Sequence, residues 1–312
     1  MKYSTRKKLF GFCLVLPWII GFVVFLLYPL SQTILYSFSN VTITPQGTET
    51  APVGFKNYTD VLFTDPDFTL GIPTFLRQMV FMVPMIVVFS LLFALLLNNH
   101  IRGQRIYRAI FFLPVILISG PVLERIRQVG ATNLPGVDSF FVFQFIYNQV
   151  PPVLSSPIQY IISNIVLIFW FSGVQVLIFL SGLQKVDNSL YEASMVDGAS
   201  AWQRFWKITI PVVKPFILLI AVYTVVDIAL SSLSPFTKVI QDGMFAPSKG
   251  FGFSSAASWL YFLFVLAALL LAFLVFGRKE KDPMRQKDKE RRRAARRAEK
   301  RHRQAQREGL GA

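Results

Sequence analysis

A run of polar and charged residues separates two strongly apolar segments near the middle of the chain. It reads LYEASMVDGASAWQRFWKITIPVVKP, residues 190–215, and its charged residues include Glu192, Asp197, Arg204 and Lys207. Ser189 and Glu192 have the spacing of a capping box, in which hydroxyl and carboxylate each accept a hydrogen bond from a backbone amide. We therefore predict a helix from about Ser189 to Gly198, where glycine accepts the left-handed conformation that ends helices.

A second short helix is predicted from Ala201 to Ile208, leading to Pro211 in the first turn of the next apolar segment. The insert carries apolar side chains, namely Tyr191, Met195, Trp202 and Phe205, beside the small residues Ala193 and Ser194. A protruding helix of this kind suits a groove on a cytoplasmic partner, and force on it would pass into the next apolar segment. The alternative is an amphipathic helix on the lipid surface, with Trp202 and Trp206 at the interface.

Residues for catalysis, for metal binding or for nucleotide binding are not evident. The phosphate-binding pattern G-x-x-x-x-G-K-[ST] does not occur in the sequence. The only cysteine, Cys13, and the two histidines, His100 and His302, form no cluster with metal-ligand spacing. We expect no enzymatic activity, no catalytic residue, no metal site and no cofactor in this chain.

The composition indicates a membrane protein. Hydrophobic residues make up 53% and charged residues 16% of the sequence, whereas soluble domains carry about 25% charged residues. A membrane helix needs roughly 20 apolar residues. Six runs qualify: Phe10 to Tyr36, Met79 to Leu97, Ala109 to Leu123, Ile158 to Leu183, Val212 to Leu233 and Ser254 to Phe276. The predicted fold class is an all-α membrane protein with six transmembrane helices over residues 10–276.

Basic residues fall in the segments that share one side of a six-helix topology. They are Lys2, Arg6, Lys7, Lys8, Arg102, Arg105, Arg108, Lys185, Arg204, Lys207 and Lys214, followed by a basic tail. The excess of Lys and Arg marks the cytoplasmic side. We predict that the N-terminus (residues 1–9), the insert (187–211) and the tail (277–312) are cytoplasmic. The first apolar run is too long for a signal peptide and lacks a small-residue cleavage site, so we expect a retained span.

Three longer loops are predicted on the opposite side. They are Ser37 to Gln78, Glu124 to Pro157 and Ser234 to Phe253. The second contains SFFVFQFIYNQV, which is apolar but too short to span and is expected to lie on the surface or dip into the membrane. The third has the glycine and proline content of an ordinary connection.

Polar residues within the predicted spans are candidates for a substrate pathway, because buried polar groups in a membrane usually face a cavity or a partner helix. Tyr223, Asp227 and Ser231 share one helix face by their spacing of four residues. Gln175 and Asn164 form a weaker set in the fourth span. Amides, carboxylates and aromatic rings suit a sugar, although an interhelical hydrogen bond would also explain Asp227. Trp259 and Tyr261 are interpreted as interfacial belt residues.

The tail from Arg278 carries fifteen Lys and Arg residues against six Asp and Glu, so it holds +9 of the net charge of +15. It has no apolar stripe to bury. We expect a frayed helix or disorder in isolation, and contact with anionic lipids at the inner leaflet. A nucleic-acid role is not expected, because no groove-reading or aromatic element accompanies the charge.

The insert resembles the EAA motif of the permease subunits of binding-protein-dependent ABC importers. That motif reads Glu-Ala-Ala, three residues, Gly, nine residues, then Ile-x-Leu-Pro. Here it is Glu192-Ala193-Ser194, then Gly198, and then Ile208, Ile210 and Pro211, with Ser and Ile as mild departures. The resemblance extends to NNHIRGQRIYRAIFFLPVI (98–116), to GVQVLIFLSGLQ and to the DGA at 197–199, which looks like the carbohydrate-importer, maltose-type branch. It covers roughly residues 79–276.

The resemblance implies that the helix near Glu192 is a coupling helix that docks into a cytoplasmic ATPase dimer, which would use ATP and Mg. It implies coupling roles for Glu192, Ala193, Ser194, Asp197, Gly198 and Pro211. It further implies a homologous second permease subunit, an extracytoplasmic solute-binding protein, a sugar or oligosaccharide substrate, and a place in the bacterial cytoplasmic membrane.

Other functions stay open at this stage. The same architecture could import a glycerol-phosphate-like or other non-sugar solute. A stand-alone secondary transporter would be expected to have inverted repeats with paired broken helices, which the sequence does not display. A structural or receptor-like membrane protein would purify without an ATPase.

Overall fold

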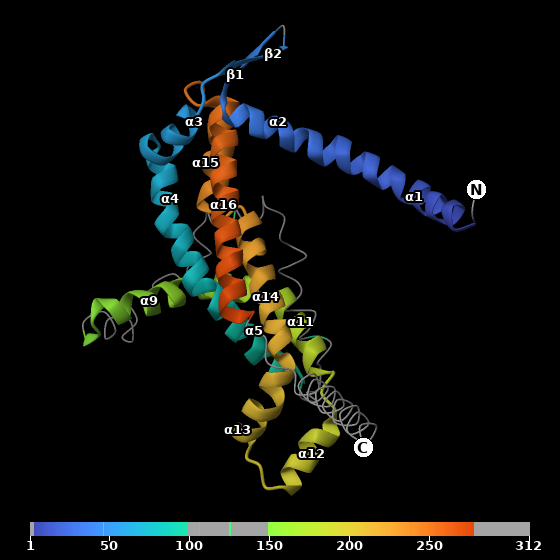
Figure 1. Cartoon of the computed structure of the whole chain (residues 1–312). Helices are drawn as coiled ribbons and strands as arrows, with labels where there is room; N and C mark the ends of the chain where they lie inside the picture. Colours follow the sequence, from blue (N-terminus) through green and yellow to red (C-terminus); the bar gives the residue numbers. More distant parts are fainter. Residues whose placement is uncertain (1–2, 46, 99–105, 107–124, 126–148, 278–312) are drawn as a thin grey trace, which may run out of the picture.

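Long apolar helices dominate the computed structural model, which describes residues 3–45, 47–98, 106, 125 and 149–277 (Figure 1). Within these residues, four helices are long and apolar enough to cross a membrane: Phe10–Ser37, Pro66–Asn98, Ala201–Phe245 and Gly250–Phe276. A bent pair of shorter helices, Ile165–Phe171 and Gly173–Leu183, gives a fifth if it is counted as one span. The predicted third span, Ala109 to Leu123, lies outside the described residues, as do most of the second outer loop and the tail.

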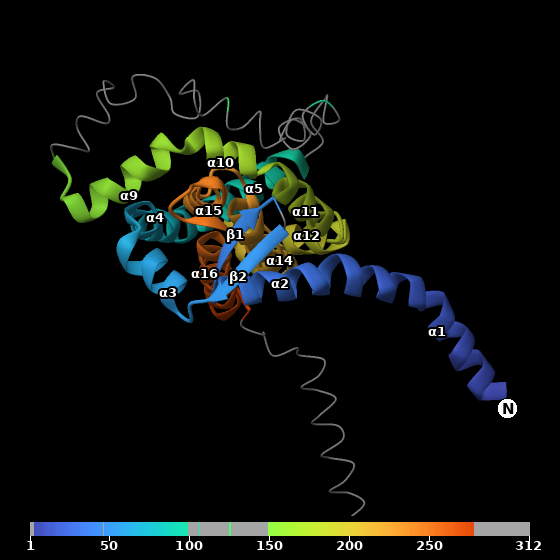
Figure 2. The ribbon, with the colours of Figure 1, turned by 90° about the horizontal axis from the view of Figure 1, so that it is seen from above.

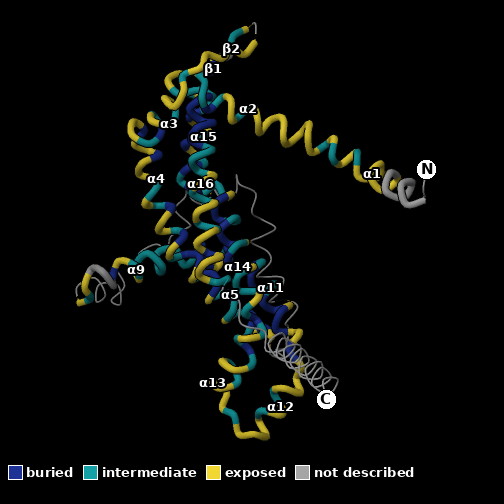
Figure 3. Tube along the Cα trace, viewed as in Figure 1, coloured by how far each residue is buried: buried dark blue, intermediate teal, exposed yellow. Residues whose placement is uncertain are grey.

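The first span is a nearly continuous helix that runs away from the other helices (Figures 1 and 2). It consists of α1 (Tyr3–Phe22), η1 (Val23–Leu27) and α2 (Tyr28–Ser37). Among the described residues, the end of this arm packs on the rest of the chain through contacts of α2 with α16 and with β1. Its apolar side chains are otherwise exposed (Figure 3).

A small β-hairpin follows in the first predicted outer loop, and the sequence did not predict it. Strands β1 (Ser39–Thr44) and β2 (Gly47–Pro52) form an antiparallel hairpin, with Ser39 opposite Pro52. The β-branched residues of SNVTIT and the following Pro and Gly favour such a hairpin. Helix α3 (Lys56–Thr59) and η2 (Asp60–Thr64) lead to the next span.

The second span begins well before the predicted Met79. Helices α4 (Pro66–Arg77), η3 (Gln78–Met82) and α5 (Val83–Asn98) form one helix of 33 residues. The early start is set by Asp65, whose carboxylate accepts a 2.8 Å hydrogen bond from the Phe68 amide, and by Pro66 in the first turn. The prediction was wrong here because it counted apolar residues and gave no weight to this cap.

The predicted fourth span, Ile158 to Leu183, is broken twice. It consists of α9 (Pro152–Ser163), α10 (Ile165–Phe171) and α11 (Gly173–Leu183), with a bend of 53° between α10 and α11. At each break a side chain bonds the backbone one turn earlier: Asn164 donates to the Tyr160 carbonyl and Ser172 donates to the Ile168 carbonyl. Such bonds compete with the helix ladder and bend helices.

The last two spans are α14 (Ile210–Leu230) and α16 (Gly250–Phe276), joined by helix α15 (Pro235–Phe245). The expectation of an ordinary connection over Ser234 to Phe253 was therefore wrong. Helix α15 is held by Phe236, which is fully buried among the rings of Phe68, Phe75 and Tyr261 at centroid distances of 4.7, 5.7 and 4.8 Å. Aromatic packing of this kind favours a helix over a loose loop.

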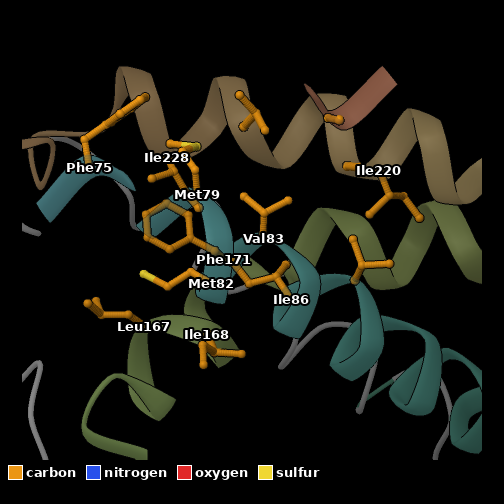
Figure 4. Packing of buried hydrophobic residues seen from close by; sticks show 14 of the residues in the cluster. Phe75, Met79, Met82, Val83, Ile86, Leu167, Ile168, Phe171, Ile220 and Ile228 are labelled. Carbon is orange, nitrogen blue, oxygen red and sulfur yellow. The ribbon is translucent and has the colours of Figure 1, made fainter. Parts of the chain in front are cut away.

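The core lies where α5, α11, α14 and α16 pack together (Figure 2). Figure 4 shows Met79, Met82, Val83 and Ile86 pointing toward the neighbouring helices. The facing side chains come from α10 and α14, namely Leu167, Ile168, Phe171, Ile220 and Ile228. This bundle is the frame that positions both candidate sites.

Candidate functional site

The polar insert protrudes from the bundle at the end opposite the β-hairpin (Figure 1). It consists of α12 (Asn188–Val196), α13 (Ala201–Arg204) and η5 (Phe205–Thr209). The two predicted helices are thus present and separated by a tight turn. The second one runs through η5 directly into α14, so this second helix and the span form one continuous helix that begins at Ala201.

The start of α12 differs from the prediction. Asp187, and not Ser189, is the cap, because its carboxylate accepts a 3.0 Å hydrogen bond from the Ser189 amide. This bond to the Ser189 backbone, followed by one to the Ser189 side chain, holds the pKa of Asp187 below its usual value. The expected capping box of Ser189 and Glu192 is therefore absent, and the Glu192 side chain stays exposed.

The end of α12 is as predicted. Gly198 has a φ of +77°, and its amide donates to the Met195 carbonyl at 3.0 Å. The next amide, of Ala199, donates to the Ser194 carbonyl at 2.9 Å. These two bonds form a Schellman motif, which requires the left-handed conformation that glycine adopts at low cost.

A capping box does occur in the insert, at the second helix. The Ser200 hydroxyl accepts from the Gln203 amide at 3.3 Å, and the Gln203 side chain accepts from the Ser200 amide at 2.8 Å. Arg204 also donates to the Ala199 carbonyl at 3.4 Å. The turn between the helices is thereby fixed on both sides, and Pro211 lies in the first turn of α14 as expected.

A direct side-chain bond joins the two halves of the insert. The hydroxyl groups of Tyr191 on α12 and Thr209 at the base of α14 lie 2.8 Å apart. Thr209 is buried, so this bond is shielded from water. The hydroxyl bond and the capped turn make α12 a rigid extension of α14.

The outer surface of α12 is uncovered. None of its residues is buried, and Val196 is 88% exposed. Glu192, Met195 and Val196 have helical spacing that places them on one face. A cleft of about 440 Å³ separates α12 from the second helix, and its lining includes Asp197, Arg204 and Lys207. An exposed helix end beside a charged cleft can seat a protein partner.

A buried polar group lies between α11 and α14 inside the bundle. Gln175 is fully buried, and its amide nitrogen donates to the Thr224 hydroxyl at 3.2 Å. The Asp227 carboxylate also interacts with the Gln175 side chain. The Gln175 carbonyl oxygen has no hydrogen-bond partner among the described residues. Gln175 on α11 and Asp227 on α14 thus lie close together.

The other candidate pathway residues are separate from this group. At the end of α9, the side-chain amide of Asn164 donates a 2.8 Å hydrogen bond to the Tyr160 carbonyl. Ser231 lies beyond the last residue of α14, with extended backbone, and donates to the Ile228 carbonyl. The predicted helix face of three residues was therefore wrong for Ser231, because α14 ends at Leu230. Tyr223 is partly exposed on α14.

Tyr261 forms a polar junction between three helices. Its hydroxyl donates to the Ala229 carbonyl at 2.6 Å and accepts from the Ser234 hydroxyl at 2.8 Å. These bonds tie α16 to the end of α14 and the start of α15. The sequence alone does not distinguish a tyrosine whose hydroxyl bonds inside the bundle from one that faces the membrane interface.

Several structural residues of these sites were missed in the sequence. Thr224 lies three residues before Asp227, a spacing that could have placed it on the same face. Ser200 and Gln203 match the capping-box spacing as well as Ser189 and Glu192 do. No sequence pattern indicates the hydrogen bond between Tyr191 and Thr209, because these residues are 18 positions apart and meet across a turn.

Comparison with known proteins places the chain among transporter subunits. It is 30% identical over 292 residues to the probable ABC transporter permease protein YesP of Bacillus subtilis (strain 168), covering 86% of this chain and 91% of the relative. The multiple sugar-binding transport system permease protein MsmF of Streptococcus mutans is 29% identical, covering 70% and 73%. The trehalose/maltose transport system permease protein MalF of Thermococcus litoralis is also 29% identical, covering 72% and 75%.

The fold is similar to that of a solved transporter. A chain from the crystal structure of a bacterial ABC transporter involved in the import of alginate aligns with a TM-score of 0.59 at 20% identity, covering 89% of this chain and 98% of that one. Residues 67–278 match the family described as "Binding-protein-dependent transport system inner membrane component", of which the EAA motif is typical. The chain therefore belongs to this family of multi-pass inner-membrane permeases.

Proposed function

We propose that this chain is the transmembrane permease subunit of an ABC importer and forms half of the translocation pathway for a sugar or oligosaccharide. Membership of the binding-protein-dependent transport family supports the transport role. The sugar assignment rests on relatives whose names include the multiple sugar-binding, trehalose/maltose and lactose transport systems. Transport proceeds by alternating access, a conformational change driven by ATP and Mg bound to a separate chain.

The proposed topology has six transmembrane helices over residues 10–276, with both termini in the cytoplasm. The domains are a cytoplasmic segment (1–9), the permease domain with its coupling loop (187–211), and a basic cytoplasmic tail (277–312) that contacts anionic lipids. The β-hairpin and the insert lie at opposite ends of the bundle (Figure 1), which agrees with an outer position for residues 39–52 and a cytoplasmic one for α12.

The single observation that carries the coupling role is the combination of exposure and rigidity in α12. Its surface is uncovered, yet the Tyr191–Thr209 bond and the Schellman turn at Gly198 fix it to α14. A helix that only rested on lipid would need no such connection to a span. In the proposal, Glu192, Ala193 and Ser194 contact the ATPase, and Asp197, Gly198 and Pro211 hold the shape of the loop.

The proposed importer contains three kinds of partner besides this chain. A homologous permease completes the pathway, an ATPase dimer binds α12 in the cytoplasm, and a solute-binding protein delivers substrate from outside. A solved transporter of similar fold was obtained in complex with an alginate-bound periplasmic protein. The family description likewise names a binding-protein-dependent system.

The proposed substrate pathway runs past Gln175, Thr224 and Asp227. The Gln175 carbonyl oxygen is buried and lacks a donor among the described residues, and a sugar hydroxyl would supply one. Tyr223 offers a partly exposed aromatic ring on α14. Asn164 and Ser231 are proposed to act only by shaping the ends of α9 and α14, since their side chains bond the local backbone.

The test is ATPase retention by charge-reversed variants. Glu192→Lys should lose the ATPase during affinity purification of the complex, because an exposed carboxylate on the docking face is inverted. Glu49→Lys is the matched control, since Glu49 is an exposed glutamate on β2 at the opposite end. The control should retain the ATPase. Equal retention of the ATPase by both variants contradicts the docking assignment.

A further inference from the structure

Three aromatic rings form an exposed cluster on the second helix of the insert. Trp202 and Trp206 are 69% and 50% exposed, and their rings meet edge to face at 5.5 Å. Phe205 lies 6.1 Å from Trp202 and 5.2 Å from Trp206 between ring centroids. Bare indole rings in water are unfavourable, since each offers a large apolar area for burial. We call these three residues the aromatic cluster.

The position of the cluster along the helix indicates what covers it. The same helix continues into α14, whose 21 residues (Ile210–Leu230) match the roughly 30 Å hydrocarbon core. At about 1.5 Å per residue, the backbone of Trp206 lies about 6 Å, and that of Trp202 about 12 Å, before Ile210. A hydrocarbon core that begins at Ile210 would place the two indoles at headgroup depth, where tryptophan is enriched because its ring is apolar and its N–H is polar.

The charges around the cluster have the sign that anionic headgroups require. In the sequence Arg204 lies between the two tryptophans and Lys207 follows Trp206, and both also line the cleft beside α12. Lys214 follows in the first turns of α14. The sequence from Ala199 to Val226 contains no Asp or Glu. Basic residues close to an anionic surface are attracted to its headgroups.

We propose that the aromatic cluster, with Arg204 and Lys207, is a binding surface for anionic lipid headgroups of the inner leaflet that fixes the height of α12 above the membrane. This inference rests on the proposed cytoplasmic position of the insert. The two helices of the insert then have different partners, and Arg204 and Lys207 lie on the second helix where it borders the cleft beside α12. The exposed carboxylate of Glu192 lies on α12, whereas the basic and aromatic groups lie on the helix that enters the membrane.

Depth-dependent fluorescence quenching tests the proposal in the full chain. A variant with Trp18→Phe, Trp170→Phe and Trp259→Phe keeps only Trp202 and Trp206, since the chain has five tryptophans. In nanodiscs containing phosphatidylglycerol, lipids labelled near the headgroup should quench this emission at least twofold more than lipids labelled at mid-chain. Quenching by aqueous iodide without quenching by any lipid label would overturn the proposal.

A second measurement keeps the test valid if the triple variant does not fold. Trp206→Cys in a Cys13→Ser background carries a nitroxide label, because Cys13 is the sole native cysteine. The label should become less mobile when phosphatidylglycerol replaces phosphatidylcholine, and Arg204→Gln with Lys207→Gln should remove that dependence. An unchanged label in both lipids, or immobilisation only when an ATPase is added, would overturn lipid binding in favour of solvent or a protein.

The two hypotheses fail in different ways. Lipid quenching needs no ATPase and is unaffected by Glu192→Lys, so its loss counts against the lipid surface alone. Loss of ATPase retention in Glu192→Lys with normal lipid quenching supports both assignments. Normal quenching with unimpaired retention in that variant leaves the lipid surface standing and counts against the docking helix.

Discussion

The hydroxyl groups of Tyr191 and Thr209 lie 2.8 Å apart and join the exposed helix α12 to the base of a candidate membrane span. Tyr191 belongs to α12, which carries no buried residue, and Thr209 ends η5, directly before α14. A contact on α12 can therefore move α14 without first bending the turn at Gly198. This connection is the mechanical basis of the proposed coupling.

Removing one hydroxyl tests this connection. Tyr191→Phe leaves the Thr209 hydroxyl buried without its partner, at a cost of about 1–3 kcal/mol to the insert. In the reconstituted complex we expect less solute uptake per ATP hydrolysed, with membrane insertion unchanged. Tyr28→Phe is the control, because Tyr28 is an exposed tyrosine on α2. Equal uptake-to-hydrolysis ratios in the two variants would show that the bond has no part in coupling.

The turn at Gly198 makes a second prediction. Its φ of +77° is left-handed, and no atom would obstruct an added Cβ, so backbone strain is the only penalty there. Gly198→Ala should weaken the turn by about 1–2 kcal/mol, whereas Gly198→Asn should be milder because Asn tolerates this conformation. Uptake should follow the order Gly, Asn, Ala. The reverse order of Asn and Ala would mean that the backbone conformation is not what matters.

The sequence was most informative where long apolar runs or a motif set the structure. The span Ser254 to Phe276 and the left-handed Gly198 are as predicted, because hydrophobic length and glycine geometry are local properties. Local signals also competed with one another. Ser189 and Ser200 both have capping-box spacing, and only Ser200 forms one, because Asp187 takes the earlier cap.

Tertiary contacts account for the elements that sequence reasoning missed. Helix α15 is held by the burial of Phe236 against rings from α4 and α16, which no local pattern announces. Likewise Gln175 and Thr224 meet across 49 residues. Of the candidate pathway residues, Asp227 and Gln175 lie near one another, whereas the side chains of Asn164 and Ser231 bond the local backbone at helix ends.

The end of the bundle beside the β-hairpin is fixed by an ion pair between Asp65 and Lys249, residues far apart in the sequence. Asp65 is 4% exposed and also caps α4. Lys249→Met should therefore leave a buried carboxylate unpaired and destabilise the protein by about 3 kcal/mol. Adding Asp65→Asn, which keeps an acceptor for the cap, should recover part of this loss. The measurement is the midpoint temperature of thermal unfolding in detergent. If the decreases caused by the two single substitutions simply added in the double variant, the pairing would be ruled out.

Acid should loosen the start of α12. The pKa of Asp187 is lowered by the hydrogen bond from the Ser189 amide, so the carboxylate stabilises the folded helix. This contribution is complete above the unfolded pKa, near 3.8, and is lost as the pH falls through the lower folded pKa. Amide hydrogen exchange in α12 should accelerate in that acidic range. Asp187→Asn should abolish the acceleration, and an identical pH dependence in that variant would assign it to another group.

The most direct measurement compares solute uptake by vesicles with and without the ATPase. Vesicles that contain this chain and its partner permease, with solute-loaded binding protein outside, should take up no solute until the ATPase and ATP are present inside. With them, uptake should proceed and should fall in the Gly198→Pro variant while ATP hydrolysis continues. Concentrative uptake by the permeases in the absence of the ATPase would contradict the account.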